Sequence, residues 1–158
     1  MEDAKTPRTA EDLEWRAQDL KWSQPPDYAG ALRLRLELER LYCQTGANVT
    51  RQAKNLNMMA HVGVHAGAFG EAERAARKCL ELYKPLATDS DERLASYLMM
   101  LSFVLAEAGK SEEAVVHGEQ AVAIFTLNHA EQDGFVRDRK RDIGRMLAKD
   151  TRPYLDGA

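Results

Sequence analysis

Two histidines four residues apart, His61 and His65, come nearest to the spacing of a metal site. On a helix, side chains at this spacing lie on one face, so two imidazoles could share an ion. The residues between them are valine, glycine and valine, so the glutamate of the zinc-protease motif H-E-x-x-H is missing. No third ligand is evident, because His117 and His129 belong to other segments. Hydrogen-bonding side chains that line a groove are therefore the preferred interpretation of this pair.

The glycines, serines and cysteines form no pattern typical of a catalytic site. Gly63, Gly67 and Gly70 do not indicate a phosphate-binding loop, because no strand precedes them and no Gly-Lys-Ser/Thr follows. No serine or cysteine has the context of a nucleophile elbow. Cys43 and Cys79 lie within helical patterns, which favours small buried side chains over a disulfide. We therefore expect no enzyme activity, no catalytic residue, no bound metal and no cofactor.

Apolar residues recur at helical spacing through most of the chain, and no segment is predicted to be a strand. The five prolines lie outside these periodic segments. Residues 128–131 have capping-box spacing before a last helix, in which Val136, Ile143 and Leu147 are the expected buried residues. The pattern predicts seven helices joined by short connections, as in stacked antiparallel pairs.

An internal repeat narrows the choice among helical architectures. Gly67 and Gly109 stand 42 positions apart (109 − 67), and residues on either side correspond at the same offset. Large residues correspond to large ones and small to small, as expected where two helices of a repeating pair pack closely. The corresponding pairs are Met59 and Leu101, Ala60 and Ser102, Ala72 and Ala114, and Cys79 and Ala121.

These residues resemble the tetratricopeptide repeat (TPR), in which a large–small pair and a turn glycine precede small residues in the second helix. The period and the run Leu-Asn-Met-Met-Ala at 56–60 are similar to the kinesin light chain variety of this repeat. The resemblance implies an all-α, right-handed solenoid of about three antiparallel helix pairs plus a C-terminal capping helix. The expected single domain spans residues 1–158, with a divergent pair at 10–43, repeats at 53–84 and 95–126, a capping helix at 131–148 and a tail at 150–158.

The resemblance also implies a binding groove, because the first helix of each TPR pair lines the concave side. Methionine and phenylalanine there would form an adaptable apolar floor, and asparagine could bind a peptide backbone. The clamp with which some TPR proteins hold a chaperone tail is not matched, so such a tail is not the expected ligand. The matching groove positions are Lys54, Asn57, Met58, His61 and His65; Ser96, Met99, Met100, Phe103 and Glu107; and Asp138, Arg141, Asp142, Arg145 and Lys149.

Composition and charge limit the class of partner. The chain is 44% hydrophobic and 30% charged, as is typical of globular proteins, and its net charge is only −3. This charge gives no reason to expect nucleic acid or an anionic membrane as the partner. No apolar run approaches the ~20 residues of a membrane-spanning helix. Residues 1–9 do not have the pattern of a targeting peptide, so a cytoplasmic protein is expected.

The sequence therefore predicts an adaptor or scaffold that binds another protein, or a peptide segment, in a concave groove. Two alternatives stay open. One is a regulatory or chaperone-like TPR protein that acts by self-association as a homo-oligomer. The other is a helical protein that binds a metal or small ligand through His61 and His65.

Overall fold

The computed structural model describes residues 9–155, and all regular secondary structure in this part of the chain is helical. The predicted domain and tail also include residues 1–8 and 156–158, which lie outside the described residues. The prediction of an all-α chain with seven helices is confirmed for the described part. The helices are α1 (Ala10–Trp22), α2 (Tyr28–Thr45), α3 (Val49–His65), α4 (Phe69–Tyr83), α5 (Glu92–Glu107), α6 (Ser111–Asn128) and α7 (Gly134–Leu147), with a short 3-10 helix, η1 (Lys84–Leu86), after α4.

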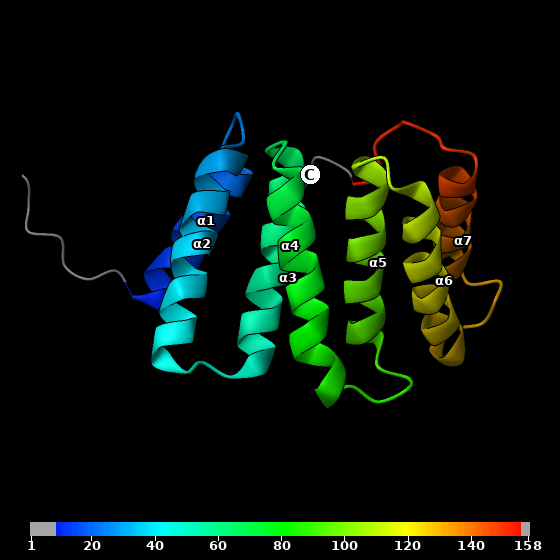
Figure 1. The fold of residues 1–158 in the computed structure, drawn as a ribbon, viewed down its shortest axis with the longest axis horizontal. Coiled ribbons are helices and arrows are strands. Elements are labelled where there is room, and N and C mark those ends of the chain that lie inside the picture. The colour runs from blue at the N-terminus through cyan, green and yellow to red at the C-terminus, as the bar shows by residue number, and fades with distance from the viewer. Residues whose placement is uncertain (1–8, 156–158) are drawn as a thin grey trace, which may run out of the picture.

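The helices stand side by side in a row that follows the order of the chain (Figure 1). Each one packs against the helices before and after it, and α3 also packs against α5. Packing between sequence neighbours is the arrangement expected of a helical repeat. None of the helices in residues 9–155 is long and apolar enough to cross a lipid bilayer.

Polar side chains and glycines set the ends of several helices. The side chains of Asp27, Asn48 and Asp91 accept hydrogen bonds from the first turns of α2, α3 and α5. Gly67 and Gly109 follow α3 and α5 with φ of 73° and 80°, a conformation that favours glycine, as their predicted role in turns requires. The predicted capping box at 128–131 is wrong, because Asp133 caps α7 instead and the helix begins at Gly134.

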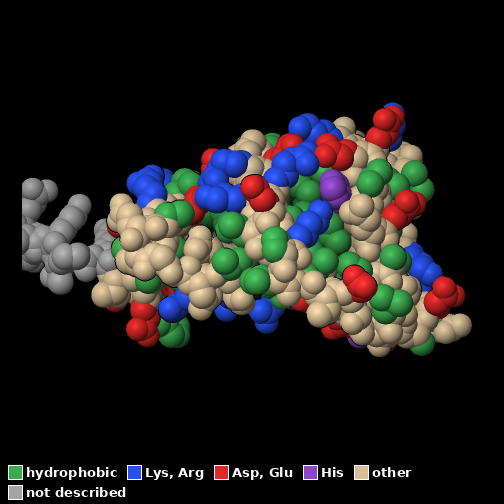
Figure 2. Space-filling view, turned by 60° about the horizontal axis from the view of Figure 1, so that its bottom comes forward, with side chains coloured by type: hydrophobic (Ala, Val, Ile, Leu, Met, Phe, Trp, Pro, Cys, Tyr) green, Lys and Arg blue, Asp and Glu red, His purple; other side chains and the backbone are tan. Residues whose placement is uncertain are grey.

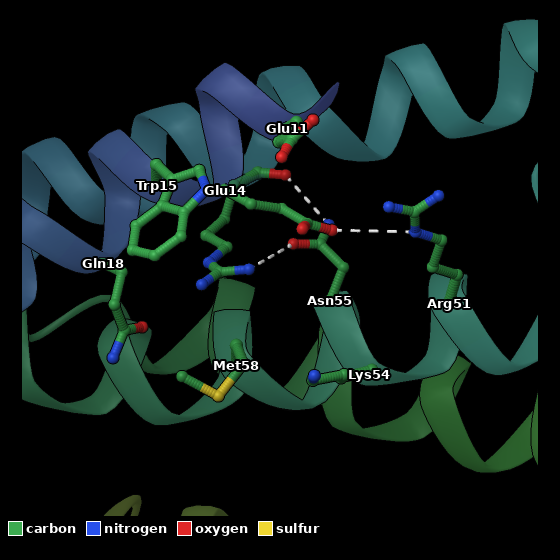
Figure 3. Close-up of a pocket in the computed structure, with 9 residues that line it drawn as sticks. Glu11, Glu14, Trp15, Gln18, Arg51, Lys54, Asn55 and Met58 are labelled. Carbon is green, nitrogen blue, oxygen red and sulfur yellow. Dashed lines mark hydrogen bonds and ion pairs between the residues drawn. The ribbon is translucent and has the colours of Figure 1, made fainter. Parts of the chain in front are cut away.

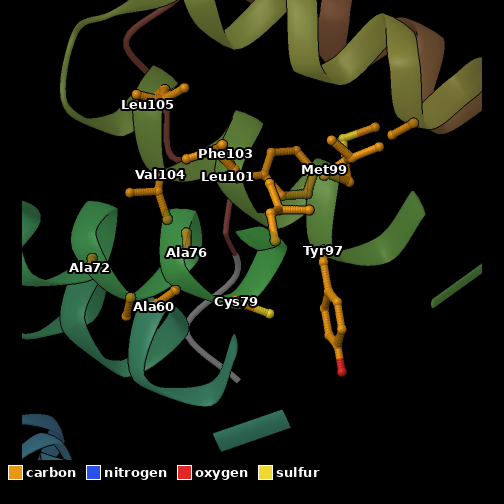
Figure 4. Packing of buried hydrophobic residues seen from close by; sticks show 14 of the residues in the cluster. Ala60, Ala72, Ala76, Cys79, Tyr97, Met99, Leu101, Phe103, Val104 and Leu105 are labelled. Carbon is orange, nitrogen blue, oxygen red and sulfur yellow. The ribbon is translucent and has the colours of Figure 1, made fainter. Parts of the chain in front are cut away.

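Small residues allow the helices of the two central repeats to approach closely. Ala72 of α4 and Ala114 of α6 are fully buried. A Cβ atom on Gly63 would lie 3.0 Å from the Cβ of Ala72, so α3 and α4 are nearly in backbone contact there. In the next repeat the Ser102 hydroxyl donates to the carbonyl oxygen of Ala114 at 2.6 Å. Both alanines belong to one apolar cluster, part of which Figure 4 shows, and the predicted packing at both alanines is confirmed.

The buried face of α7 differs by one residue from the predicted one. Val136 and Ile143 are buried, as expected, but Leu147 is 66% exposed. Met146 takes its place and is fully buried in the main apolar cluster. The cysteines also differ from each other: Cys79 is buried, with Sγ 3.2 Å from the carbonyl oxygen of Ala53, whereas Cys43 is exposed, against the prediction.

Buried apolar residues form two clusters of unequal size. The main cluster extends from Ala31 and Leu32 in α2 through α3 to α7. A separate small cluster in the first two helices has only three buried members, Leu13, Leu38 and Tyr42. The first helix pair therefore has little apolar core of its own.

Candidate functional site

A hollow of about 610 Å³ opens between α1 and α3, with α2 at its base. Trp15 lies on the α1 side and Met58 on the α3 side (Figure 3). Figure 2 shows one face of the molecule, on which hydrophobic side chains lie in the middle among Lys, Arg, Asp and Glu side chains. The lining residues are Glu11, Glu14, Trp15, Gln18, Arg35, Arg51, Lys54, Asn55 and Met58.

Helical periodicity places these side chains together. On α1 the lining residues recur at steps of three, one and three, and on α3 the steps are the same, which keeps each set on one face. The start of α1 is fixed by a capping box between Thr9 and Asp12. The start of α3 is fixed by Asn48, whose Oδ1 accepts from the N–H of Arg51 at 2.9 Å. The hollow is thus built on regular backbone.

Arg35 is the most unusual group of the hollow, because its side chain is charged and only 8% of the residue is exposed. Its Nη1 donates to Oδ1 of Asn55 at 3.3 Å, and the Asn55 amide donates back to the Arg35 carbonyl oxygen at 3.1 Å. Burial lowers the pKa of the guanidinium, and the charge of Glu14 acts in the opposite direction. Among residues 9–155, no carboxylate lies within ion-pairing distance of Arg35. The Nε and Nη2 atoms of Arg35 are not among the buried side-chain atoms without a hydrogen-bond partner, so these donors are accessible from the hollow.

The acidic groups of the hollow are partly engaged elsewhere. Glu14 accepts a short hydrogen bond from the hydroxyl of Tyr42 and lies 3.9 Å from Nε of Arg51. Burial, followed by this contact with Glu14, raises the pKa of Tyr42 to about 12, so the phenol remains a donor at neutral pH. Lys54, by contrast, is exposed at the rim. The lining therefore holds three cationic residues and two acidic ones beside the apolar Trp15 and Met58; the charged residues are Arg35, Arg51 and Lys54, and Glu11 and Glu14.

The predicted groove positions are brought together only in part. Lys54 and Met58 line the hollow, whereas the half-buried Asn57 is not among its lining residues. Ser96 is exposed and Met100 is half-buried on α5. Arg141 is exposed and pairs with Asp138 on its own helix at 3.1 Å.

Two predicted members of an exposed apolar floor are buried instead. Met99 is 3% and Phe103 5% exposed, so that expectation is wrong. The ring of Phe103 is covered by Tyr154, at a centroid distance of 6.3 Å, and by the guanidinium of Arg139, 5.3 Å above it. Tyr154 belongs to the tail, and the chain itself therefore occupies this part of the predicted groove.

The end of the predicted groove on α7 is also partly closed. Asp142 is buried, and burial raises the pKa of its carboxyl group although Arg139 and Arg145 lie 3.6 and 3.8 Å away. Arg145 also contacts the tail, and Glu107 of α5 does the same. Lys149 is exposed and has φ of 53°. Asp142, Arg145 and Glu107 therefore act in contacts within the chain, whereas Lys149 remains exposed.

His61 and His65 are adjacent on α3, with ring centroids 4.7 Å apart, and His65 stacks on Tyr28 at 4.8 Å. Burial, then the nearby Lys21 and His65, lowers the pKa of His61 to about 4. In the described part of the chain, no group of three or more His, Cys, Asp or Glu side chains is arranged to hold a metal ion. The two histidines thus lie on the side of α3 that faces Lys21 of α1 and Tyr28 of α2.

The residues that sequence reasoning misses are those contributed by the first two helices. Trp15 and Gln18 lie in the pair that matches the repeat least well, where Gln18 and Asp19 replace the expected large–small residues. Arg35 lies on a second helix, which the TPR resemblance assigns to the outer side. The residues from Ala31 to Leu38 alternate leucine with Arg33, Arg35 and Glu37, so nothing in the sequence distinguishes the buried Arg35 from its charged neighbours.

Comparison with known proteins leaves the family open. The sequence matches no protein-family model and no curated protein.

Proposed function

We propose that this protein binds an extended segment of another protein in the hollow between α1 and α3. The proposal takes the chain to be a cytoplasmic adaptor with a TPR-like, right-handed solenoid of about three helix pairs and a capping helix. The packing of each helix on its neighbours and the 42-residue recurrence support that architecture. Binding, rather than catalysis, is the function that fits an open hollow of mixed apolar and charged lining.

The single observation that carries the proposal is the buried, incompletely paired guanidinium of Arg35 at the base of the hollow. A guanidinium has five N–H donors, and here a single side-chain acceptor, Oδ1 of Asn55, is within hydrogen-bonding distance. A carboxylate from a partner would supply the missing charge and acceptors. Trp15 is 66% exposed beside it, and large exposed aromatic side chains are common anchors of binding surfaces. The favoured ligand is therefore a segment with an acidic residue next to an apolar one.

The two tryptophans provide a direct test. Trp15 lines the hollow, whereas Trp22 is exposed on the same helix and is not among the lining residues. In a Trp22→Phe variant the emission of Trp15 reports on the hollow alone. Acetylated hexapeptides that combine one Asp or Glu with one Leu or Phe should change this emission in a saturable way. The corresponding amide peptides, with Asn or Gln, should bind at least about tenfold more weakly.

Variants of the protein separate a specific site from general adhesion. Arg35→Gln keeps a hydrogen-bonding group next to Asn55 but removes the charge, and Lys54→Ala removes the exposed cation at the rim. Each should weaken binding of the acidic peptides about tenfold while the protein stays folded. Lys84→Ala, on η1, is the matched control and should change nothing. Equal affinity for acidic and amide peptides, or no response from Trp15 to any peptide, would refute the proposal.

A further inference from the structure

The chain reverses direction after α7 and returns to α5. The N–H of Asp150 donates to the carbonyl oxygen of Arg145 at 2.9 Å, which closes the end of the helix around Lys149. Lys149 has φ of 53°, a left-handed conformation that turns the chain back. Figure 1 shows the segment after α7 passing back above α6 to the end of α5. We call residues 150–155 the returning tail.

Tyr154 is the centre of the contact between the returning tail and the helices. Its ring lies 6.3 Å from the ring of Phe103 on α5, nearly parallel to it at 29°. The guanidinium of Arg145 on α7 lies 4.3 Å from the centroid of the Tyr154 ring. Aromatic stacking and a cation over the ring face both contribute to binding beyond simple burial. Tyr154 thus lies against an aromatic residue from one helix and a cation from another.

Most of the remaining contacts of the tail use its backbone, and almost any peptide could make these; the exception is Asp150, whose Oδ2 accepts from Nε of Arg145 at 3.2 Å. Arg145 Nη2 donates to the carbonyl oxygens of Arg152 and Pro153 at 2.7 and 3.2 Å. Oε1 of Glu107 accepts from the N–H groups of Tyr154 and Leu155 at 2.5 and 3.4 Å. Arg145 therefore holds two carbonyls and Glu107 two amides, a pattern independent of side chains. Among these contacts between the tail and the helices, those of the Tyr154 ring and of the Asp150 carboxylate depend on a side chain of the tail.

The residues that hold Tyr154 correspond, at the 42-residue offset of the repeat, to other positions that were predicted to line the binding groove. Phe103 corresponds to His61 and to Arg145, and Glu107 corresponds to His65 and to Lys149. The returning tail therefore lies on the face of α5 and α7 that is equivalent to the His61 face of α3. It does so with few side-chain anchors: Arg152 is exposed, and Tyr154 and Leu155 are only half-buried.

We propose that Phe103, Glu107 and Arg145 form a second peptide-binding site, selective for an aromatic residue in an extended segment, and that Tyr154 occupies it as an internal competitor. This inference rests on the proposed function, since a partner segment with a Tyr or Phe would have to displace the returning tail. The occupant is thus an aromatic-bearing segment of the partner, bound through the contacts that Tyr154 makes here.

The test uses a fluorescein-labelled peptide with the sequence of residues 150–155 and measures its binding to the full chain by fluorescence anisotropy. Tyr154→Ala removes the competing ring, so the peptide should bind this variant about tenfold more tightly than the unaltered protein. Tyr154→Phe keeps the ring and should behave like the unaltered protein. In the Tyr154→Ala background, Glu107→Ala should abolish the gain, because the peptide amides lose their acceptor.

The possible outcomes are distinct. Equal binding to the unaltered, Tyr154→Ala and Tyr154→Phe proteins would overturn the inference, as would no binding to Tyr154→Ala at millimolar peptide. A peptide with Ala in place of tyrosine should not bind, and its binding with equal affinity would also refute the aromatic selectivity. Lys54→Ala in the first hollow should leave this binding unchanged. Failure of either site can therefore be recognised separately from failure of the other.

Discussion

The imidazole of His61 lies in an environment that opposes its protonation. It is partly buried on α3, its neighbours include Lys21 and His65, and its buried Nδ1 has no hydrogen-bond partner among residues 9–155. A proton added to this ring would place a positive charge close to an existing cation and away from water. At neutral pH the ring is therefore neutral and contributes through packing.

This environment predicts a pH dependence of stability with a definite sign. The pKa of His61 is about 4 in the folded protein and near its ordinary value of 6.5 in the unfolded chain. Between these values the unfolded chain binds more protons, so the stability present above pH 6.5 is lost as the pH falls toward 4. Because the ring is not fully buried, we expect a loss of about 1–2 kcal/mol. Chemical denaturation at intervals from pH 7 to 4.5 measures it.

A variant isolates the contribution of this one ring. His61→Gln removes the titration but keeps a polar side chain of similar reach. Its free energy of unfolding should fall less steeply between pH 6.5 and 4.5 than that of the unaltered protein. Parallel curves for the two proteins would mean that His61 does not titrate abnormally.

On the scale of an element, α7 provides a pair of neighbouring residues with opposite environments. Met146 is fully buried against the main cluster, whereas Leu147 is largely exposed. Met146→Ala should leave a cavity and cost about 2–5 kcal/mol of stability. Leu147→Ala should change the stability by less than about 0.5 kcal/mol. Similar shifts in the Tm of the two variants would show that α7 is rotated from the orientation described.

Features of the fold that depend on local sequence were predicted better than features that depend on tertiary contacts. Helices were predictable because their apolar spacing is a local pattern, although the cap of α7 was placed wrongly. The contacts at Ala72 and Ala114 were predictable because the two residues correspond in the 42-residue repeat. The face of α7 is off by one residue, since Met146 and Leu147 are both apolar and only tertiary packing distinguishes them. Burial of Phe103 depends on Tyr154, 51 positions away (154 − 103), which periodicity cannot reveal.

The candidate site was predictable to a smaller degree than the fold. Lys54 and Met58 come from matching one repeat to a family pattern, and both do line the hollow. Trp15 and Arg35 come from α1 and α2, where that pattern is weak. The depth of a hollow depends on how far apart two helices stand, and this distance is decided by packing across several elements. The sequence of a single helix does not determine this distance.

At the scale of the whole molecule, the two apolar clusters predict unequal stability along the row of helices. The cluster of Leu13, Leu38 and Tyr42 is small and separate from the main one. We therefore expect α1 and the α1-facing side of α2 to open without global unfolding. In hydrogen exchange with mass spectrometry, amides of α1 should exchange at least about tenfold faster than those of α5, which lies in the main cluster.

This prediction connects to binding, because α1 forms one wall of the hollow. A ligand that binds only when α1 is in place stabilises that conformation by mass action. An acidic peptide that fills the hollow should therefore slow exchange in α1 more than in α5. Uniform protection of α1 and α5 in the free protein would show that the chain unfolds as one cooperative unit.

Because the chain reverses at Lys149, Tyr154 stays close to its site, and this determines how tightly a partner must bind to displace it. Tyr154 is only seven positions after the end of α7 at Leu147 (154 − 147), so the ring is tethered next to its own site. Such a short tether corresponds to an effective concentration on the order of millimolar. A free segment present at micromolar concentration and equal in intrinsic affinity would therefore rarely displace it. A partner that also engages the hollow between α1 and α3 would compete on equal terms, since its second contact would likewise be intramolecular.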